Sequence, residues 1–215
     1  MKNLLLIAAA AATLAPFASQ AESNFVTTTG STTPPAIAKL DFKIVVPKVL
    51  FLQVGAGTSM ADNSSVSKVT FDVPASDIGK STAPVSGTGG DLAGGAVTVR
   101  VLGNSGNVVL TNTTAGELTN GVLGDPTIPW SAISATPVAL ASATPGYTAD
   151  DVISHPTFNA TGGASASPVT LTALAGLVRR EGSWTFKYAN ASVLPAGTYG
   201  DETGKGRVTY TATAP

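Results

Sequence analysis

The residue types that carry most acid–base and metal chemistry are scarce in this chain of 215 residues, which has one histidine and no cysteine. The histidine, His155, stands in the turn-like stretch Ile153-Ser154-His155-Pro156, and no second histidine exists to share a metal ion. No G-x-S-x-G elbow offers a serine nucleophile for a Ser–His–Asp arrangement. We therefore expect His155 to be a plain turn or surface residue.

Two further patterns could hold a ligand through oxygen atoms or backbone amides. The adjacent acidic pairs Asp150-Asp151 and Asp201-Glu202 could bind calcium, but neither has the alternate spacing of a calcium loop, so we expect solvated turns. Gly79-Lys80-Ser81-Thr82 matches the end of a phosphate-binding loop, yet Pro74 stands where that loop needs its first glycine. The sequence thus predicts no cofactor, no metal site and no enzymatic activity.

The first 21 residues have the three parts of a secretory signal. After Lys2, the apolar run from Leu4 to Leu14 is too short for a permanent membrane helix, and Ser19-Gln20-Ala21 offers a cleavage site. We expect an exported protein, in the periplasm in transit and then at the cell surface or secreted, with no transmembrane segment in the mature chain. A net charge of −1 without a basic run argues against nucleic acid as a partner.

The elements that must position any site are strands, because apolar residues recur with a period of two. The segments with this pattern are 39–46, 69–73, 97–101, 169–173, 184–188 and 207–214. Two further segments are continuous apolar runs: 49–52, which is apolar on both faces as in a central strand, and the shorter 108–110. Gly- and Pro-rich turns between them predict an all-β, antiparallel sandwich. Residues 172–180 are expected to form a short helix.

The predicted domain organisation is a polar N-terminal extension over residues 22–36 and one sandwich domain over residues 37–215. Six prolines interrupt the stretch around residues 116–168, which is the least regular part of the chain. That stretch is either a surface excursion with a binding loop or a set of short strands that the pattern does not reveal.

The last twenty residues, AGTYGDETGKGRVTYTATAP, combine a Gly-rich bend with a strand that carries Val208, Tyr210 and Ala212 on one face. Tyr199, after a glycine corner, is similar to the corner tyrosines of immunoglobulin-like sandwiches. Together with the signal and the polar leader, this ending resembles that of bacterial fimbrial subunits of the chaperone–usher type. The resemblance implies an immunoglobulin-like sandwich with Greek-key-type connections.

The resemblance also implies a function, that of a non-catalytic structural subunit of a surface fimbria or pilus. Subunits of this type are sandwiches that lack one strand. A periplasmic chaperone fills the gap, and at the outer-membrane usher the N-terminal extension of the next subunit replaces the chaperone strand. On this view Val208, Tyr210 and Ala212 border the gap. Many such subunits carry a disulfide, whereas this chain has no cysteine.

The best donor strand by pattern is the segment 39–46, in which Leu40, Phe42, Ile44 and Val46 alternate with polar residues. In one interpretation the extension runs to residue 46 and donates this strand to another chain. In the other, residues 37–46 are the domain's own half-buried first strand.

A different class of function is a self-contained secreted sandwich that binds a glycan or a protein, as an adhesin or a carbohydrate-binding module. Such modules display exposed aromatic rings, and the candidates in the irregular stretch are Trp130, Tyr147 and Phe158.

Overall fold

The computed structural model describes residues 23–140, 144–148, 152–201 and 204–215. The predicted signal, residues 1–21, lies outside the described residues. The chain divides into two units, of which the first ends at Val46 and the second begins at Pro47. This division coincides with the longer of the two extents considered for the N-terminal extension.

In the first unit, residues 23–46 form no helix or strand. The apolar side chains of the alternating segment are largely exposed, with exposed fractions of 76% for Leu40, 85% for Phe42, 87% for Ile44 and 74% for Val46. These four side chains are therefore exposed in a single copy of the chain, whereas the alternating pattern predicts that they are half-buried. None of the described strands pairs with the segment.

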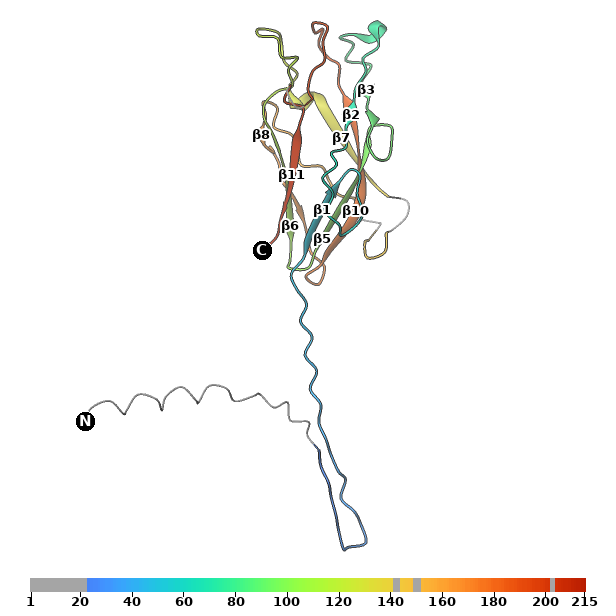
Figure 1. The fold of residues 1–215 in the computed structure, drawn as a ribbon. Coiled ribbons are helices and arrows are strands. Elements are labelled where there is room, and N and C mark those ends of the chain that lie inside the picture. Colours follow the sequence, from blue (N-terminus) through green and yellow to red (C-terminus); the bar gives the residue numbers. More distant parts are fainter. Residues whose placement is uncertain (1–22, 141–143, 149–151, 202–203) are drawn as a thin grey trace, which may run out of the picture. The chain divides into compact units, whose positions relative to one another are not determined.

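The second unit is an all-β sandwich of antiparallel sheets, as the sequence predicts (Figure 1). The first sheet contains β1 (Leu50–Val54), β3 (Val85–Ser86), β5 (Ala96–Gly103), β7 (Ile133–Ala139) and β10 (Val178–Tyr188). The second contains β6 (Val108–Thr114), β8 (Gly163–Ala164), β9 (Val169–Leu171) and β11 (Val208–Thr213). A small ribbon pairs β2 (Val69–Thr70) with β4 (Thr88–Gly89).

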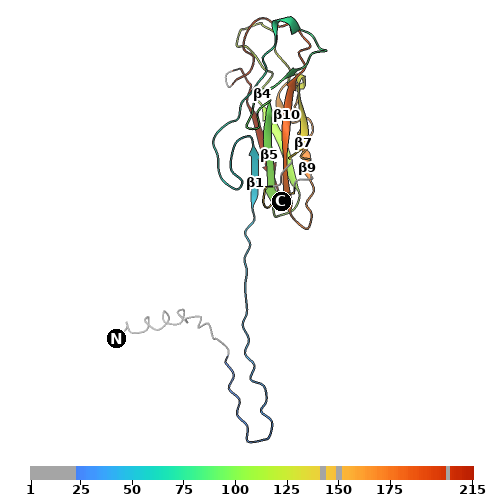
Figure 2. The same cartoon turned by 90° about the vertical axis from the view of Figure 1, so that its right-hand side faces the viewer.

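The long strand β10 organises the first sheet. Along one side it pairs with β5 and then with β3, and along the other side with β7. Next to β5 lies β1, which forms one edge of the sheet. In the second sheet β6 is central, between β11 and the two short strands β8 and β9. Figure 2 shows β5, β10 and β7 in succession across the first sheet.

The core fills the space between the two sheets, and the alternating pattern of the sequence explains which side chains enter it. From β5 come Val97, Val99 and Val101, and from β10 come Trp184 and Phe186, all of them buried. The intervening residues point to the outer face, as expected for a period of two. Short 3-10 turns at η1 (Ala75–Asp77) and η2 (Trp130–Ala132) complete the regular structure.

Two details of the described chain differ from the sequence-based expectations. The predicted helix at residues 172–180 is absent, because Leu174 and Leu177 hydrogen-bond to each other through their backbones and close a tight turn between β9 and β10. Within the irregular stretch, β7 forms seven residues of strand despite Pro137. Proline is tolerated there because β7 is an edge strand with a partner on one side only.

Candidate functional site

A groove of about 820 Å³ opens along one side of the sandwich, between β1 and β11. Among the described residues, β1 pairs only with β5 and β11 pairs only with β6, so each strand has one edge without a partner strand. The lining is formed by Leu52 and Val54 from β1, by Val208 and Tyr210 from β11, and by the segment 63–71, whose apolar members are Val66, Val69 and Phe71. Figure 1 shows the two strands on the same side of the sandwich.

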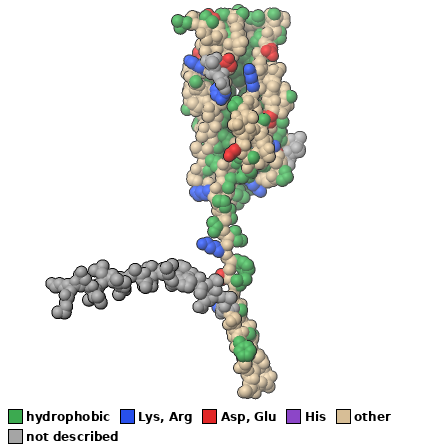
Figure 3. Space-filling view, viewed as in Figure 1, with side chains coloured by type: hydrophobic (Ala, Val, Ile, Leu, Met, Phe, Trp, Pro, Cys, Tyr) green, Lys and Arg blue, Asp and Glu red, His purple; other side chains and the backbone are tan. Residues whose placement is uncertain are grey.

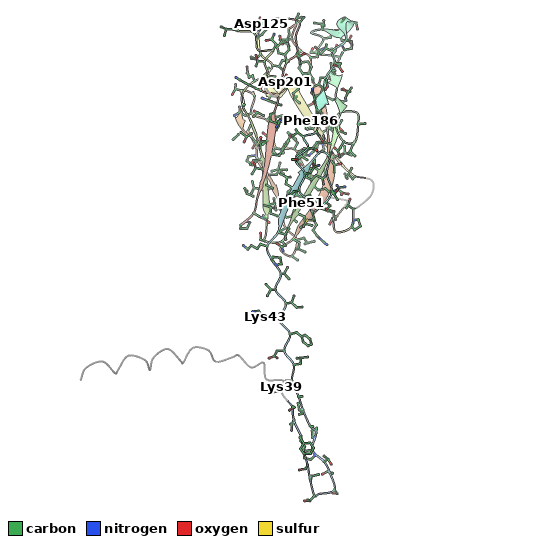
Figure 4. The ribbon with its side chains drawn as sticks, in the orientation of Figure 1. Lys39, Lys43, Phe51, Asp125, Phe186 and Asp201 are labelled. Carbon is green, nitrogen blue, oxygen red and sulfur yellow. The ribbon has the colours of Figure 1, made fainter. Side chains whose placement is uncertain are left out.

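The floor of the groove is made of aromatic and aliphatic side chains that belong to the core. Val97, Trp130, Phe158 and Phe186 all line it, and each is at least nine-tenths buried. The rings of Trp130 and Phe158 pack with their centroids 5.0 Å apart, and the indole nitrogen of Trp130 donates a hydrogen bond to the carbonyl of Gly116. Figure 4 labels Phe186 inside the sandwich. The groove is therefore a gap in the wall of the core.

The two ends of the groove differ. We call the end of the sandwich at which β1 begins and the chain ends the base, and the opposite end the tip. At the base, the Lys48 Nζ atom donates a hydrogen bond to the carbonyl of Pro215 across a distance of 3.3 Å, which links the start of β1 to the end of the chain. Toward the tip the lining includes Leu118, Gly206 and Arg207, which lie beyond the start of β11. The groove is bridged at the base and continues to the tip.

The rim of the groove is mostly polar, although the exposed side chain of Val66 also lines it. Its lining residues with polar side chains, other than those of β11, are Asn63, Ser65, Ser67, Lys68, Asp201 and Arg207. Ser67 is held in place because its hydroxyl accepts a hydrogen bond from the backbone amide of Ala56 at 2.9 Å. A polar rim around an apolar floor favours an occupant whose one face is apolar and whose other face meets water.

His155 packs against the aromatic core beneath the groove, so the prediction that it is a plain turn or surface residue is wrong. Its ring packs edge-on against Phe158, at 4.6 Å between centroids, and against Trp184, at 4.7 Å. The Nε2 atom lies 2.8 Å from the Tyr210 hydroxyl. Burial lowers the pKa of His155 to about 4, against a smaller opposing effect of a backbone hydrogen bond at Pro156. Burial also raises the pKa of Tyr210, so both groups are neutral at neutral pH.

Of the predicted interface residues on the last strand, the structure brings Val208 and Tyr210 into the groove, and Ala212 lies outside its lining. Ala212 is half-buried and packs against the core nearer the base. Sequence reasoning missed the opposite wall, because the apolar run that ends at Leu52 is typical of a central strand, whereas β1 lies at the edge of its sheet. The candidate donor residues Leu40, Phe42, Ile44 and Val46 belong to the first unit and are exposed.

The three aromatic residues considered as a ligand loop are all buried, with exposed fractions of 4% for Trp130, 9% for Tyr147 and 8% for Phe158. Trp130 and Phe158 belong to the floor of the groove. Tyr147 lies elsewhere, and its hydroxyl is 2.8 Å from that of Ser59. Buried rings of this kind do not form the exposed aromatic row that the binding-module interpretation requires.

A second polar cluster, which the sequence did not indicate, lies on the outer face of the first sheet. Glu181 is fully buried and forms an ion pair with Arg100, which also donates to the side chains of Gln53 at 3.1 Å and Thr144 at 3.0 Å. Burial acts to raise the pKa of Glu181, but hydrogen bonds from Thr144 and Arg100 outweigh it and leave the pKa below its ordinary value. The charged groups of Arg100 and Glu181 are bonded to each other and to neighbouring side chains, so we interpret the cluster as a structural clamp and not as a binding site.

No group of three or more metal-ligating side chains occurs among the residues that the structure describes. Asp150, Asp151 and Glu202 from the two acidic pairs lie outside those residues. Gly79 and Lys80 follow a 3-10 turn, where Lys80 pairs with Asp77 at 3.4 Å and the Gly79 amide donates to the Asn190 side chain. In the described parts of the chain, no helix has the length and apolar character needed to cross a membrane.

Comparisons with family models, with curated proteins and with solved structures give no match for this chain. The arguments for its function therefore come from the groove and from the sequence.

Proposed function

We propose that this chain is a non-enzymatic structural subunit of a bacterial surface fimbria that polymerises by strand donation. In this proposal the segment Ile37–Val46 of one copy occupies the groove of the next. The observation that carries it is a groove that reaches down to core rings between two strand edges without partner strands, in a chain that also has an exposed segment with alternating apolar residues. The gap and the segment that could fill it are thus present on the same molecule.

The physics of strand addition favours this arrangement. The edges of β1 and β11 offer backbone donors and acceptors to an extended chain, which supplies affinity, while alternate side chains enter pockets. Leu40, Phe42, Ile44 and Val46 would face the aromatic floor. Lys39, Asp41 and Lys43, on the opposite face of the segment, would face water. Burying four such apolar side chains stabilises the junction by roughly 6 to 12 kcal/mol, at about 1.5 to 3 kcal/mol each.

Export precedes assembly in this proposal. Residues 1–21 direct the chain to the periplasm, where an unfilled groove would be a site of aggregation because an open strand edge pairs with any extended chain. A periplasmic chaperone that lends a strand to the groove protects the subunit, and an outer-membrane usher exchanges that strand for the segment of the next subunit. These partners follow from the resemblance of the chain's ending to fimbrial subunits, and the open groove supports them.

The alternative proposal, a self-contained adhesin or carbohydrate-binding module, has less support. Its candidate rings Trp130, Tyr147 and Phe158 are all buried. An apolar groove with a polar rim suits an extended polypeptide better than a sugar, because sugars bind by stacking on open ring faces and through many hydrogen bonds.

The proposal can be tested with the secreted form of the chain, purified and examined by denaturing gel electrophoresis with and without boiling. Strand-exchanged polymers resist the detergent until boiled, so we expect a ladder in the unboiled sample and a single band after boiling. Replacing Phe42 and Ile44 with serine removes apolar side chains from the proposed donor face and should abolish the ladder. The matched control replaces Lys39 and Lys43 with serine on the opposite face of the same segment, and it should leave the ladder intact.

A complementary measurement uses a synthetic peptide of residues 37–46 and a variant that lacks those residues. We expect the peptide to bind the variant and to raise its unfolding temperature, since a ligand that binds only the folded state stabilises it. A chain that stays monomeric, unfolds at the same temperature with and without the peptide, and is indifferent to loss of residues 37–46 would rule out strand donation.

A further inference from the structure

The chain between β1 and β2 closes into a compact loop over residues 56–67, which we call the edge loop. Its two ends meet, because the Ser67 hydroxyl accepts a hydrogen bond from the backbone amide of Ala56 at 2.9 Å. A Cβ atom on Gly55 would clash with the Ser67 side chain. Within the loop, the side-chain amide of Asn63 donates to the carbonyl of Ala56 at 2.8 Å. Surface loops whose ends meet in this way are self-contained units that often have a function.

The edge loop lies along the free edge of β1. A small cavity of about 90 Å³ separates the loop from the strand, and its lining includes residues 51–54 of β1 together with Ala61, Asn63 and Ser65 of the loop. Successive residues of a strand point to opposite faces, so a cavity that all four strand residues line lies at the edge of β1 and not over one of its faces. Figure 2 shows the loop beside β1.

The same edge of β1 carries the backbone groups that a donated strand needs. In an antiparallel pair, residues point their amide and carbonyl groups alternately toward the partner strand and away from it. The Gly55 amide donates to the carbonyl of Thr98 at 2.8 Å, so the backbone groups of Leu52 and Val54 point away from β5. A strand added at that edge would lie about 4.8 Å from β1, in the space that the edge loop and the small cavity occupy.

Few contacts hold the edge loop against β1. All of its residues except Ser59 and Ser67 are exposed. In the part of the chain that the structure describes, no backbone hydrogen bond joins the loop to β1. The strand holds it through the side chain of Gln53, which donates to the carbonyl of Gly57 at 3.2 Å. Segments with so few buried contacts open at a low cost in free energy.

A second side-chain contact ties the edge loop to the rest of the sandwich, and we call it the latch. The hydroxyls of Ser59 and Tyr147 lie 2.8 Å apart and share a hydrogen bond. Tyr147 is buried, and the next residue is fixed to β10 because the Thr148 amide donates to the carbonyl of Arg179 at 2.8 Å. The latch therefore fastens a weakly held loop to a rigid neighbour.

The edge loop also lines the large groove at its β1 side. The residues that it contributes are Asn63, Ser65, Val66 and Ser67, three of which are polar. Figure 3 shows hydrophobic side chains in small groups, scattered among other residues, on the face of the sandwich seen in Figure 1. With the loop in this position, the groove presents mainly polar side chains along its β1 side.

From these observations we infer that the edge loop is a gate for strand donation. When the gate is closed, the loop occupies the edge of β1, and a donated strand pairs with β1 only after the latch parts and the loop swings outward. Gly55 and Gly57, with φ angles of 89° and 154°, stand where the loop begins and supply the hinge. This inference rests on the proposed strand donation. In a free copy the closed gate keeps the edge of β1 from pairing with unrelated chains.

A gate has a kinetic signature. If the loop is open in only a fraction of the copies, the apparent dissociation constant is raised by the inverse of that fraction. Easier opening therefore speeds association and strengthens binding by the same factor. The rate of release stays the same, because the loop is already open while the strand is bound.

The test uses the secreted form of the chain with Phe42→Ser and Ile44→Ser, which disable its own donor face and leave the groove vacant. The probe is a fluorescent peptide of residues 37–46, whose association and release are followed by stopped-flow anisotropy. In the first gate variant, Tyr147→Phe removes the latch hydroxyl and keeps the ring. In the second, two glycines replace residues 57–66, which the meeting ends of the loop allow.

We expect Tyr147→Phe to speed association by about two- to tenfold, the range for the loss of one hydrogen bond, and the shortened loop to speed it further, with release unchanged in both. The matched control is Tyr199→Phe, which removes a hydroxyl that donates to the carbonyl of Pro195 and should change neither rate. Equal association rates in all these chains, or faster release from the shortened variant, would refute the gate and leave strand donation standing. If the peptide binds none of them, strand donation itself is wrong.

Discussion

The half-buried position of His155 against the aromatic core predicts a loss of stability in mildly acidic solution. In the unfolded chain the pKa of this histidine is 6.5, and burial lowers it in the folded chain to about 4. Between these values the unfolded state binds a proton that the folded state does not, so stability falls as the pH is lowered through this window. The sign is opposite to that of a histidine that gains an acidic partner.

The size of the effect follows from the two pKa values. Between pH 7 and pH 5 the free energy of unfolding should fall by about 2 kcal/mol. Carboxylates with ordinary pKa values remain ionised over most of this range. His155 is the chain's one histidine, so the change in that interval is assigned to a single side chain.

Urea unfolding followed by tryptophan fluorescence measures this change, since Trp130 and Trp184 are both buried and report on the core. The comparison variant is His155→Gln, which keeps a hydrogen-bonding partner for the Tyr210 hydroxyl but does not titrate. We expect the variant to lose the dependence on pH between 7 and 5, whatever its stability at pH 7. Titration of the imidazole by nuclear magnetic resonance supplies a second measurement. A pKa at or above 6 in the folded protein, or an unchanged pH dependence in the variant, would refute the reasoning.

Two further predictions concern the clamp and the groove. Glu181→Gln leaves the mostly buried Arg100 without its counter-charge and should lower the free energy of unfolding by about 3 to 5 kcal/mol in urea titrations. The control is Asp77→Asn at the exposed pair with Lys80, which should lower it by less than about 1 kcal/mol. Equal effects of the two substitutions would contradict the role of burial. A copy of residues 37–46 joined after Pro215 through a short Gly-containing turn should fill its own groove, because β11 ends at the base and the added strand then runs antiparallel to it toward the tip. That fusion should be monomeric by size-exclusion chromatography and unfold at a higher temperature than the unfused chain, and a fusion that still polymerises would show that a strand running from the base to the tip does not fill the groove.

The strands that sequence reasoning located are those in which packing and backbone pairing act on the same residues. In β5 and β10, valines and aromatic residues alternate with Thr, Lys and Arg, and the structure places the apolar set in the core. The final strand was found in the same way, within one residue at each end. A period of two is decisive when one face of a strand is buried and the other is not.

The elements that sequence reasoning missed are governed by turns and by edge positions. Residues 172–180 contain good helix formers, but Gly176 adopts a positive φ of 79° and the chain reverses there, so β10 begins at Val178. For β7, Pro137 concealed a strand, because a proline argues against strand only where both edges of the strand are paired.

The candidate site was predictable only in part. Alternation along β11 shows which side chains face inward, and Val208 and Tyr210 were identified in this way. It does not show which edge of the strand lacks a partner, since that depends on how strands far apart in sequence are ordered in the sheets. The environment of His155 could not be predicted for the same reason, because its neighbours Trp184 and Tyr210 come from strands far along the chain.

The edges on the far flank of the sandwich are poor templates for pairing. There the first sheet ends in β7, which contains Pro137, and the second ends in β8 and β9, which have two and three residues. Proline and very short strands are two of the means by which proteins prevent sheets from joining side by side. In the proposed assembly, each copy would therefore join others through one side only, and the polymer would be a single thread that neither branches nor bundles.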